Sequence, residues 1–166
     1  MSGKYYGKYR GIVSDTNDPL MIGRIQATVP DVLGDQASGW ALPCLPFAGN
    51  GMGFVLLPTV GASVWIEFEQ GDLDYPVWTG CWWGSASDLP TGATAPPYQK
   101  TMLVTAGGHR ITLDDTSGSG GIILETSTGQ KISMTSSGIE IETGQGGKIA
   151  LTGSQVSVND GALEVI

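Results

Sequence analysis

The sequence predicts an all-β protein built in two parts. Glycine accounts for 26 of the 166 residues, against roughly 7% in an average protein. Charged residues make up only 14% of the chain. No run of residues has the periodicity of an amphipathic helix, whereas several short runs alternate between apolar and polar side chains. Many glycines, few charges and period-two patterns together favour short strands joined by tight turns.

The composition changes abruptly after Tyr98, and this change divides the chain. All 13 aromatic residues, all nine prolines and both cysteines lie at or before Tyr98, whereas residues 101–166 contain 12 glycines and none of those three kinds. We therefore expect a domain at residues 1–84, a linker at residues 85–100 and a different kind of structure at residues 101–166. The prolines of the linker keep it extended and outside a sheet interior.

The first domain has the pattern of a small β-barrel. In two of its runs every other side chain is apolar, which places one set on a common inner face. The set comprises Ile25, Ala27, Val29, Val64, Ile66 and Phe68. About five strands with glycine-rich joints in this length are typical of a barrel of the OB type. The predicted strands are residues 5–14, 23–29, 63–69 and 76–83, with a turn at 15–19.

The second region repeats an apolar-x-apolar doublet followed by a polar bend that usually contains glycine. One such strand buries too little apolar surface to be stable alone, since a buried aliphatic side chain contributes only about 1.5–3 kcal/mol. The doublets in one chain make one wall, and a prism of three chains is the simplest closure, roughly 34 Å long at about 4.8 Å per strand. The doublets are Ile111/Leu113, Ile122/Leu124, Ile132/Met134, Ile139/Ile141, Ile149/Leu151, Val156/Val158 and Leu163/Val165.

The candidate catalytic and metal-binding residues suit structural roles better. Glu67 and Glu69 share a strand face about 7 Å apart, within the range of a glycosidase pair, but exposed alternating glutamates are far more often solvated. Asp114 and Asp115 suit a turn better than a metal pair, and His109 is the only histidine. We therefore expect no catalytic residue, no metal site and no cofactor.

Three further features have competing explanations. The glycine run at 49–53 lacks the Lys-Ser/Thr of a phosphate-binding loop and is interpreted as a turn. Cys44 and Cys81 could pair across the barrel, but two buried free thiols are favoured in a chain made in the cytoplasm. Four tryptophans could form a stacking surface for a ligand, or could fill the barrel core and an interface. They are Trp65, Trp78, Trp82 and Trp83. We expect at least one of Trp82 and Trp83 in an interface.

The net charge, the hydropathy and the N-terminal residues argue against nucleic-acid binding, a membrane span and a signal peptide. The formal net charge is −8, which opposes binding to nucleic acid. No stretch approaches the roughly 18 apolar residues of a membrane span, and the first residues lack the apolar core of a signal peptide. We therefore expect a protein made in the cytoplasm and not exported by a classical signal.

Several motifs resemble the central spikes of contractile tails. This family comprises the phage baseplate assembly protein V group, the T-even phage central spike and the VgrG proteins of type VI secretion. The resemblance runs from about Tyr9 to Val165 and rests on the order of the motifs. They are GRI at residues 23–25, GNGMG at 49–53, PTVG at 58–61, FEQGD at 68–72, PVWTG at 76–80, GHRITLDD at 108–115 and NDGALEV at 159–165.

The resemblance implies an OB domain followed by an intertwined trimeric β-helix, a needle in the form of a triangular prism. It implies a homotrimer that docks on a hub protein at the end of the tail tube, contacts the target envelope transiently and carries a PAAR-type protein on its C-terminal end. The hub domain of VgrG and the lysozyme of the T-even spike have no counterpart here, so hub and tip are expected to be other proteins.

These expectations assign a role to each group of residues. The doublets from Ile111 to Val158 form the trimer core, and Leu163, Val165 and Ile166 form the end that meets a tip partner. Trp78, Trp82 and Trp83 are candidates for the hub or inter-domain interface. The protein would then reside in a virion tail baseplate or in a related injection particle. A carbohydrate-binding OB module on a trimeric stalk and an envelope-degrading enzyme are the competing hypotheses.

Overall fold

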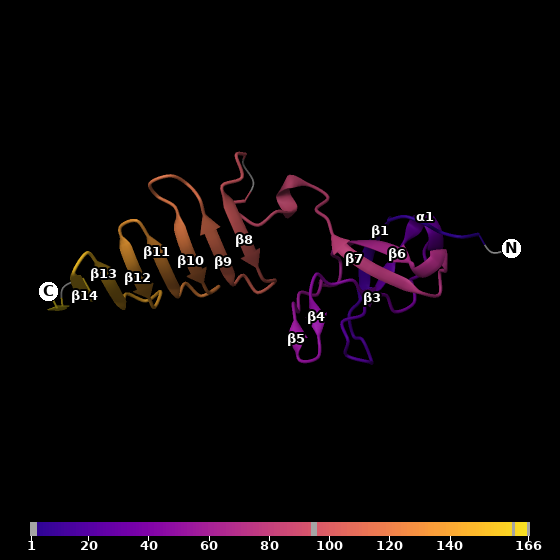
Figure 1. Ribbon diagram of the computed structural model, residues 1–166, viewed down its shortest axis with the longest axis horizontal. Helices are drawn as coiled ribbons and strands as arrows, with labels where there is room; N and C mark the ends of the chain where they lie inside the picture. Colours follow the sequence, from indigo (N-terminus) through magenta and orange to yellow (C-terminus); the bar gives the residue numbers. More distant parts are fainter. Residues whose placement is uncertain (1–2, 94–95, 161, 166) are drawn as a thin grey trace. The chain divides into compact units, whose positions relative to one another are not determined.

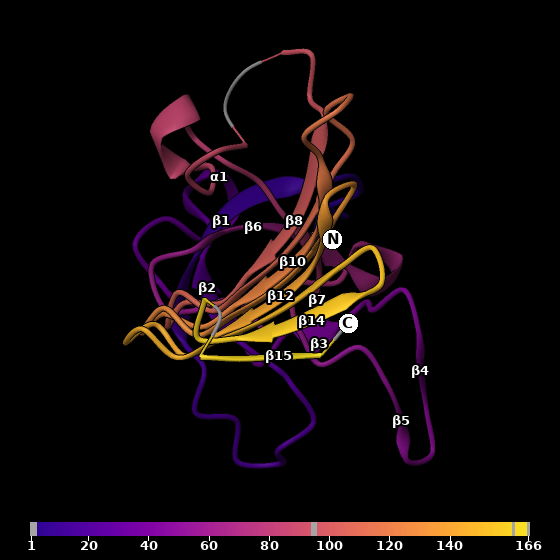
Figure 2. The same cartoon turned by 90° about the vertical axis from the view of Figure 1, so that its left-hand side faces the viewer.

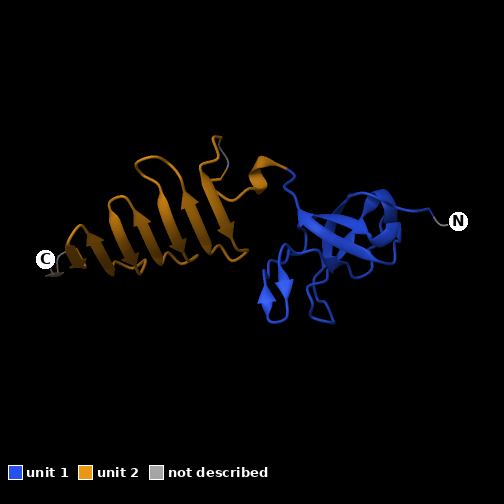
Figure 3. Cartoon of the chain, viewed as in Figure 1, with its two compact units in different colours: residues 1–84 blue, residues 85–166 orange. Residues whose placement is uncertain are grey.

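The computed structural model describes residues 3–93, 96–160 and 162–165. The chain divides into two compact units, residues 1–84 (unit 1) and residues 85–166 (unit 2) (Figure 3). Strands dominate both units (Figure 1), so the predicted all-β class is confirmed. Within the described residues, no helix is long and apolar enough to cross a membrane.

Unit 1 is built on one five-stranded sheet in the order β2-β1-β6-β7-β3. Its strands are β1 (Tyr9–Asp15), β2 (Gln26–Thr28), β3 (Leu42–Pro43), β6 (Ser63–Phe68) and β7 (Pro76–Cys81). The segment before β3 also bridges to β2 through Thr28–Ala37 and Ile25–Ala41. Because the same segment then pairs with β7 through Leu42 and Pro43, the sheet curls into the partly open barrel expected of an OB fold.

The core of unit 1 is small and almost completely closed. Ala27, Val29, Val64 and Ile66 have no exposed surface, which confirms the inner face predicted from the alternation. The helix α1 (Pro30–Leu33) closes the end of the barrel, with Val32 and Leu33 packed against the core. The remaining buried apolar residues are Val13, Ile25, Ala41, Phe68 and Trp78.

Three short elements lie outside the barrel sheet of unit 1. The strands β4 (Ala48–Gly49) and β5 (Met52–Gly53) pair in a two-stranded sheet of their own. The 3₁₀ turn η1 (Glu69–Gly71) follows β6. A Cβ atom at Gly71 would lie 2.9 Å from the backbone nitrogen of Tyr5, whose N–H donates to the Gly71 carbonyl. Glycine at this position therefore lets the N-terminal segment pack onto the turn.

Unit 2 is a single eight-stranded antiparallel sheet in which each strand pairs with the next along the chain. Figure 2 looks along this stack, with the C-terminal strands nearest the viewer. A 3₁₀ turn, η2 (Ala86–Asp88), precedes it, capped by the Ser85 side chain. The strands are β8 (Lys100–Val104), β9 (Arg110–Asp114), β10 (Gly121–Glu125), β11 (Lys131–Thr135), β12 (Gly138–Glu142), β13 (Lys148–Thr152), β14 (Gln155–Val158) and β15 (Leu163–Val165).

The strand β8 did not emerge from the doublet pattern. It begins at Lys100, the last residue of the predicted linker, and pairs with β9 over its whole length. The positions of β8 that continue the face of the doublets are Thr101 and Leu103, which oppose Leu113 and Ile111. Because one of the two is a threonine, the strand lacks the apolar-x-apolar signature of the others.

Candidate assembly interface

The strand register of unit 2 aligns the doublets in two continuous apolar rows. Neighbouring strands pair without a shift from β9 to β15, so each doublet residue faces one on the next strand. One row is Leu113, Ile122, Met134, Ile139, Leu151, Val156 and Val165. The other is Leu103, Ile111, Leu124, Ile132, Ile141, Ile149, Val158 and Leu163.

These rows, which we call the doublet face, are uncovered in the single chain. From Ile111 to Leu151 the exposed fraction of every doublet residue lies between 37% at Met134 and 43% at Ile111. The row from Leu103 to Ile141, together with the adjoining turn residues, lines an open pocket of about 650 Å³ at one border of the doublet face. Monomeric proteins rarely expose an apolar surface this continuous, so the geometry is that of half an interface.

The opposite face of the sheet is polar and largely satisfied within the chain. Thr112 and Ser133 are each only 6% exposed. Lys148 Nζ lies 2.9 Å from Glu140 Oε1. This hydrogen bond lowers the pKa of Glu140 and raises the pKa of Lys148, so both stay charged near neutral pH. Such a face can remain in water when the doublet face is covered.

Charged residues also alternate in sign along one edge of this polar face. Strand pairing sets Glu125 beside Arg110 and Lys131, and sets Glu142 beside Lys131 and Lys148. Arg110 Nε lies 3.6 Å from Glu125 Oε2. A shift of one strand by two residues would break these pairs, so the alternation supports the same register that aligns the doublet face.

Three of the residues considered for catalysis or metal binding make hydrogen bonds within the chain. Glu67 accepts a hydrogen bond of 2.6 Å from Lys8. Asp114 accepts from the Thr116 hydroxyl at 2.6 Å, which lowers the pKa of the aspartate, and His109 Nδ1 accepts from the Ser127 amide at 3.3 Å. In the part of the chain that the structure describes, no three His, Cys, Asp or Glu side chains cluster as a metal site would require.

The expectation that the cysteines are buried is wrong. Cys44 and Cys81 are free thiols, and both are exposed. Cys44 follows the two-residue strand β3, and Cys81 is the last residue of β7. At these strand ends the neighbouring strands no longer cover the side chain. Partial burial nevertheless raises the pKa of the Cys81 thiol.

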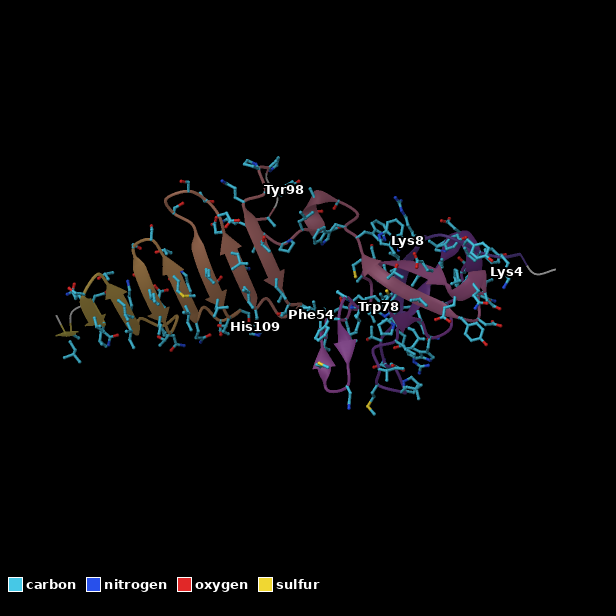
Figure 4. All side chains as sticks on the ribbon, in the orientation of Figure 1. Lys4, Lys8, Phe54, Trp78, Tyr98 and His109 are labelled. Carbon is cyan, nitrogen blue, oxygen red and sulfur yellow. The ribbon has the colours of Figure 1, made fainter. Side chains whose placement is uncertain are left out.

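The three tryptophans proposed for an interface occupy different environments. Trp78 is 4% exposed and its indole N–H donates to the Gly23 carbonyl at 3.1 Å, so it is a core residue and not a surface for a partner (Figure 4). Trp82 is half-buried and packs against Trp65, with the Arg10 guanidinium 5.0 Å from its ring centre. Trp83 is 61% exposed and is the one available for an intermolecular contact.

The C-terminal end is described only in part. Leu163 is 61% exposed at the beginning of β15. The side chain of Val165 and the whole of Ile166 lie outside the described residues. Leu103 and the exposed apolar loops of unit 1 were not identified from the sequence. The charge-free run from Gln36 to Ile66 could have indicated the segment at residues 46–57, but not the loop at residues 18–24.

Comparison with known proteins agrees with both halves of this architecture. Residues 9–83 match the OB domain of type VI secretion and phage-baseplate injectors, and residues 100–164 match the C-terminal trimerisation domain of phage baseplate protein V. The second match lies on the unit that carries the doublet face.

Two curated relatives are VgrG proteins. The type VI secretion system spike protein VgrG4b of Pseudomonas aeruginosa is 38% identical over 56 residues, which is 34% of this chain and 7% of that protein. The actin cross-linking toxin VgrG1 of Vibrio cholerae is 31% identical over 90 residues, which is 51% of this chain and 8% of that protein. The chain thus spans less than a tenth of either relative. With both of its units matched, the chain belongs to the baseplate V and VgrG-type spike family.

Proposed function

We propose that this protein is the homotrimeric central spike of a contractile-tail baseplate, in a phage or a related injection system. One observation carries the proposal: the doublet face is continuous, apolar and uncovered in a single chain. Three such faces turned toward a common axis form a closed prism with the charged face outward. The match to a trimerisation domain supports the same number of chains.

The energetics favour closure. Covering the exposed two-fifths of each doublet side chain contributes on the order of 1 kcal/mol. Every doublet side chain in both rows makes this contribution, and it is made in each of the three chains. Continuous strand pairing from β8 to β15 also resists bending. A rigid, narrow prism of this kind can transmit the force of sheath contraction to a small area of the target envelope.

The remaining contacts follow from this role. Unit 1 docks on the hub at the end of the tail tube, with Trp83 as the most exposed aromatic contact among the three predicted tryptophans. The exposed Leu163 end of unit 2 receives a small PAAR-type tip protein. The role is structural and involves no catalysis or cofactor, and the protein resides in the baseplate of the particle.

The solution mass of the full chain, measured by light scattering, tests the trimer. We expect three times the chain mass of 17.3 kDa. A chain from which residues 101–166 have been deleted should lose the trimer or retain only a weak one. A full chain that remains a monomer at micromolar concentration would contradict the proposal.

The spike role is tested in particles of the parent system. Particles assembled with an Ile141→Asp chain should lack a central spike in electron micrographs, whereas particles with an Ile123→Asp chain should retain it. Ile123 lies on the polar face, where it pairs with Thr112 and Ser133 of the two neighbouring strands. The second variant therefore controls for the introduced charge itself. Clearing of peptidoglycan or saturable, tryptophan-dependent glycan binding by the purified chain would instead support one of the competing hypotheses.

A further inference from the structure

Unit 1 exposes a second apolar surface outside its barrel core. It consists of two segments. One is the loop at residues 18–24, between β1 and β2, and the other is the segment at residues 46–57, which contains β4 and β5. We call the segment at residues 46–57 the arm. In the loop, Met21 is 89% exposed, and in the arm, Val55 is 84% exposed. The other exposed apolar residues here are Leu20, Ile22, Phe47, Met52, Phe54, Leu56 and Leu57.

The loop is held rigidly in this exposed conformation. The Asp18 carboxylate accepts hydrogen bonds from the backbone amides of Leu20, Ile22 and Arg24. It also accepts from the Arg24 guanidinium at 2.7 and 2.8 Å, which holds the pKa of Asp18 far below its usual range. Met21 adopts a left-handed backbone with φ of 54°. A preorganised apolar loop tip is typical of a surface that binds a partner.

The arm stands apart from the barrel sheet and joins the loop at its base. Its strands pair with each other, and the Phe47 and Phe54 rings meet edge to face at 6.3 Å. A two-stranded ribbon is only marginally stable by itself in water. Leu57 packs over Gly23, where a Cβ atom would lie 3.1 Å from Leu57 Cδ2. Loop and arm project from the same side of unit 1 in both views (Figures 1 and 2).

The charge of this surface fits another copy of the chain better than a basic or an acidic partner. Residues 36–66 contain no charged side chain, and the charge of Asp18 is matched by Arg24. Copies of a chain with a net charge of −8 repel one another. They can approach closely only where each presents a neutral surface. A basic partner would instead favour acidic residues on this surface, and an acidic partner would favour basic ones.

Trimerisation of unit 2 supplies the proximity that such a contact needs. Three copies of unit 1 are tethered to one needle, which raises their effective concentration to the order of millimolar. We infer that the loop and arm of unit 1 form a second interface between copies of this chain within the trimer. The inference rests on the homotrimer proposed above. It adds that the barrels are fastened to one another and do not hang independently from the needle.

Photo-crosslinking of the full chain tests this interface directly. The probe is p-benzoylphenylalanine in place of Phe54, and the control is the same probe in place of Tyr6, which is 69% exposed elsewhere on unit 1. Irradiation of the Phe54 variant should produce species of two and three chain masses on a denaturing gel, in a yield that does not fall on dilution. The Tyr6 variant should remain almost entirely at one chain mass.

A second variant distinguishes the interface from the needle. Met21→Asp, combined with the Phe54 probe, places like charges at the contact and should reduce crosslinking at least several-fold, while light scattering still reports a trimer. A trimer in which the Phe54 probe reacts only within its own chain would overturn the inference and leave the proposed function standing. A monomer by light scattering would overturn both.

Discussion

The two units solve the problem of burying apolar surface in opposite ways. Unit 1 turns its alternating side chains into a barrel, and Ile66 and its neighbours are completely buried within one chain. Unit 2 has equally regular alternation, yet Ile141 and its neighbours remain about 40% exposed. Both units therefore satisfy the same period-two rule, but only one of them completes its core without a partner.

The difference lies in how each sheet ends. In unit 1 the segment at residues 37–43 bridges to β2 and then to β7, so the sheet curls and its inner face is enclosed. In unit 2 every strand returns beside the previous one, and the sheet extends as an open wall. We propose that this open face is covered by the doublet faces of other copies of the chain. The following changes test this contrast, from the largest expected effect to the smallest.

Ile141→Asp should abolish the trimer. In a closed prism this change places three carboxylates near one axis, in an apolar interior where unpaired charges are strongly disfavoured. Light scattering should then report a single chain mass, while circular dichroism still reports a folded unit 1. Ile123→Asp, on the opposite face, should leave the mass unchanged. A stable trimer that carries Ile141→Asp would show that the doublet face is not the interface.

Ile66→Ala should destabilise unit 1 by about 2–5 kcal/mol, because it leaves a cavity in a core with no exposed surface. The loss should appear in a denaturant titration as a lower midpoint that does not depend on protein concentration. Unit 2 should respond differently, since the equivalent truncation Ile132→Ala should give a midpoint that depends on concentration. Equal concentration dependence for the two variants would contradict the contrast between the units.

Gly138→Ala should lower the thermal stability of unit 2 by about 1–3 kcal/mol per chain. Gly138 has φ of 147°, and a Cβ atom there would overlap the carbonyl oxygen of Leu151 on the neighbouring strand. The control is Gly146→Ala, where φ is 96° and the space is open. Calorimetry should show a larger loss for Gly138→Ala, and equal losses would mean that the contact with Leu151 is relaxed.

Asp18→Asn should destabilise unit 1 in a way that depends on pH. The hydrogen bonds from Arg24 hold the pKa of Asp18 below its usual 3.8. The ionised carboxylate therefore stabilises the folded state above that pH, and the contribution is lost as the pH falls through the lowered pKa. Urea midpoints of the wild type and the variant should differ at pH 7 and converge in acid.

A suitable control for this change is Asp31→Asn, in the exposed first turn of α1. It should leave the midpoint almost unchanged across the same range of pH. If Asp18→Asn lowers the urea midpoint by the same amount at every pH, the stability of the loop at residues 18–24 depends on the shape of the Asp18 side chain and not on its charge.

The local pattern of the sequence was sufficient for the longer strands of unit 1 and for the doublet strands of unit 2, and for which of their side chains share a face. It did not identify β3, β4, β5 or β8. Alternation identified the buried set from Ile25 to Phe68, and the doublets identified the two apolar rows, because the side chains of a strand point alternately to its two faces. The abrupt loss of aromatic residues after Tyr98 marked a change in architecture, because the repeat region has no large side chains around which a single chain could build a core.

Only the tertiary structure decided where these faces lie relative to solvent. It placed Trp78 in the core and left Trp83 exposed, although the sequence analysis treats both as interface candidates. It added β8 through pairing with β9, exposed the two cysteines at strand ends, and revealed the loop organised by Asp18. Burial depends on contacts between segments distant in the sequence, such as residues 37–43 with β2 and β7, and a local pattern carries no information about which segments meet.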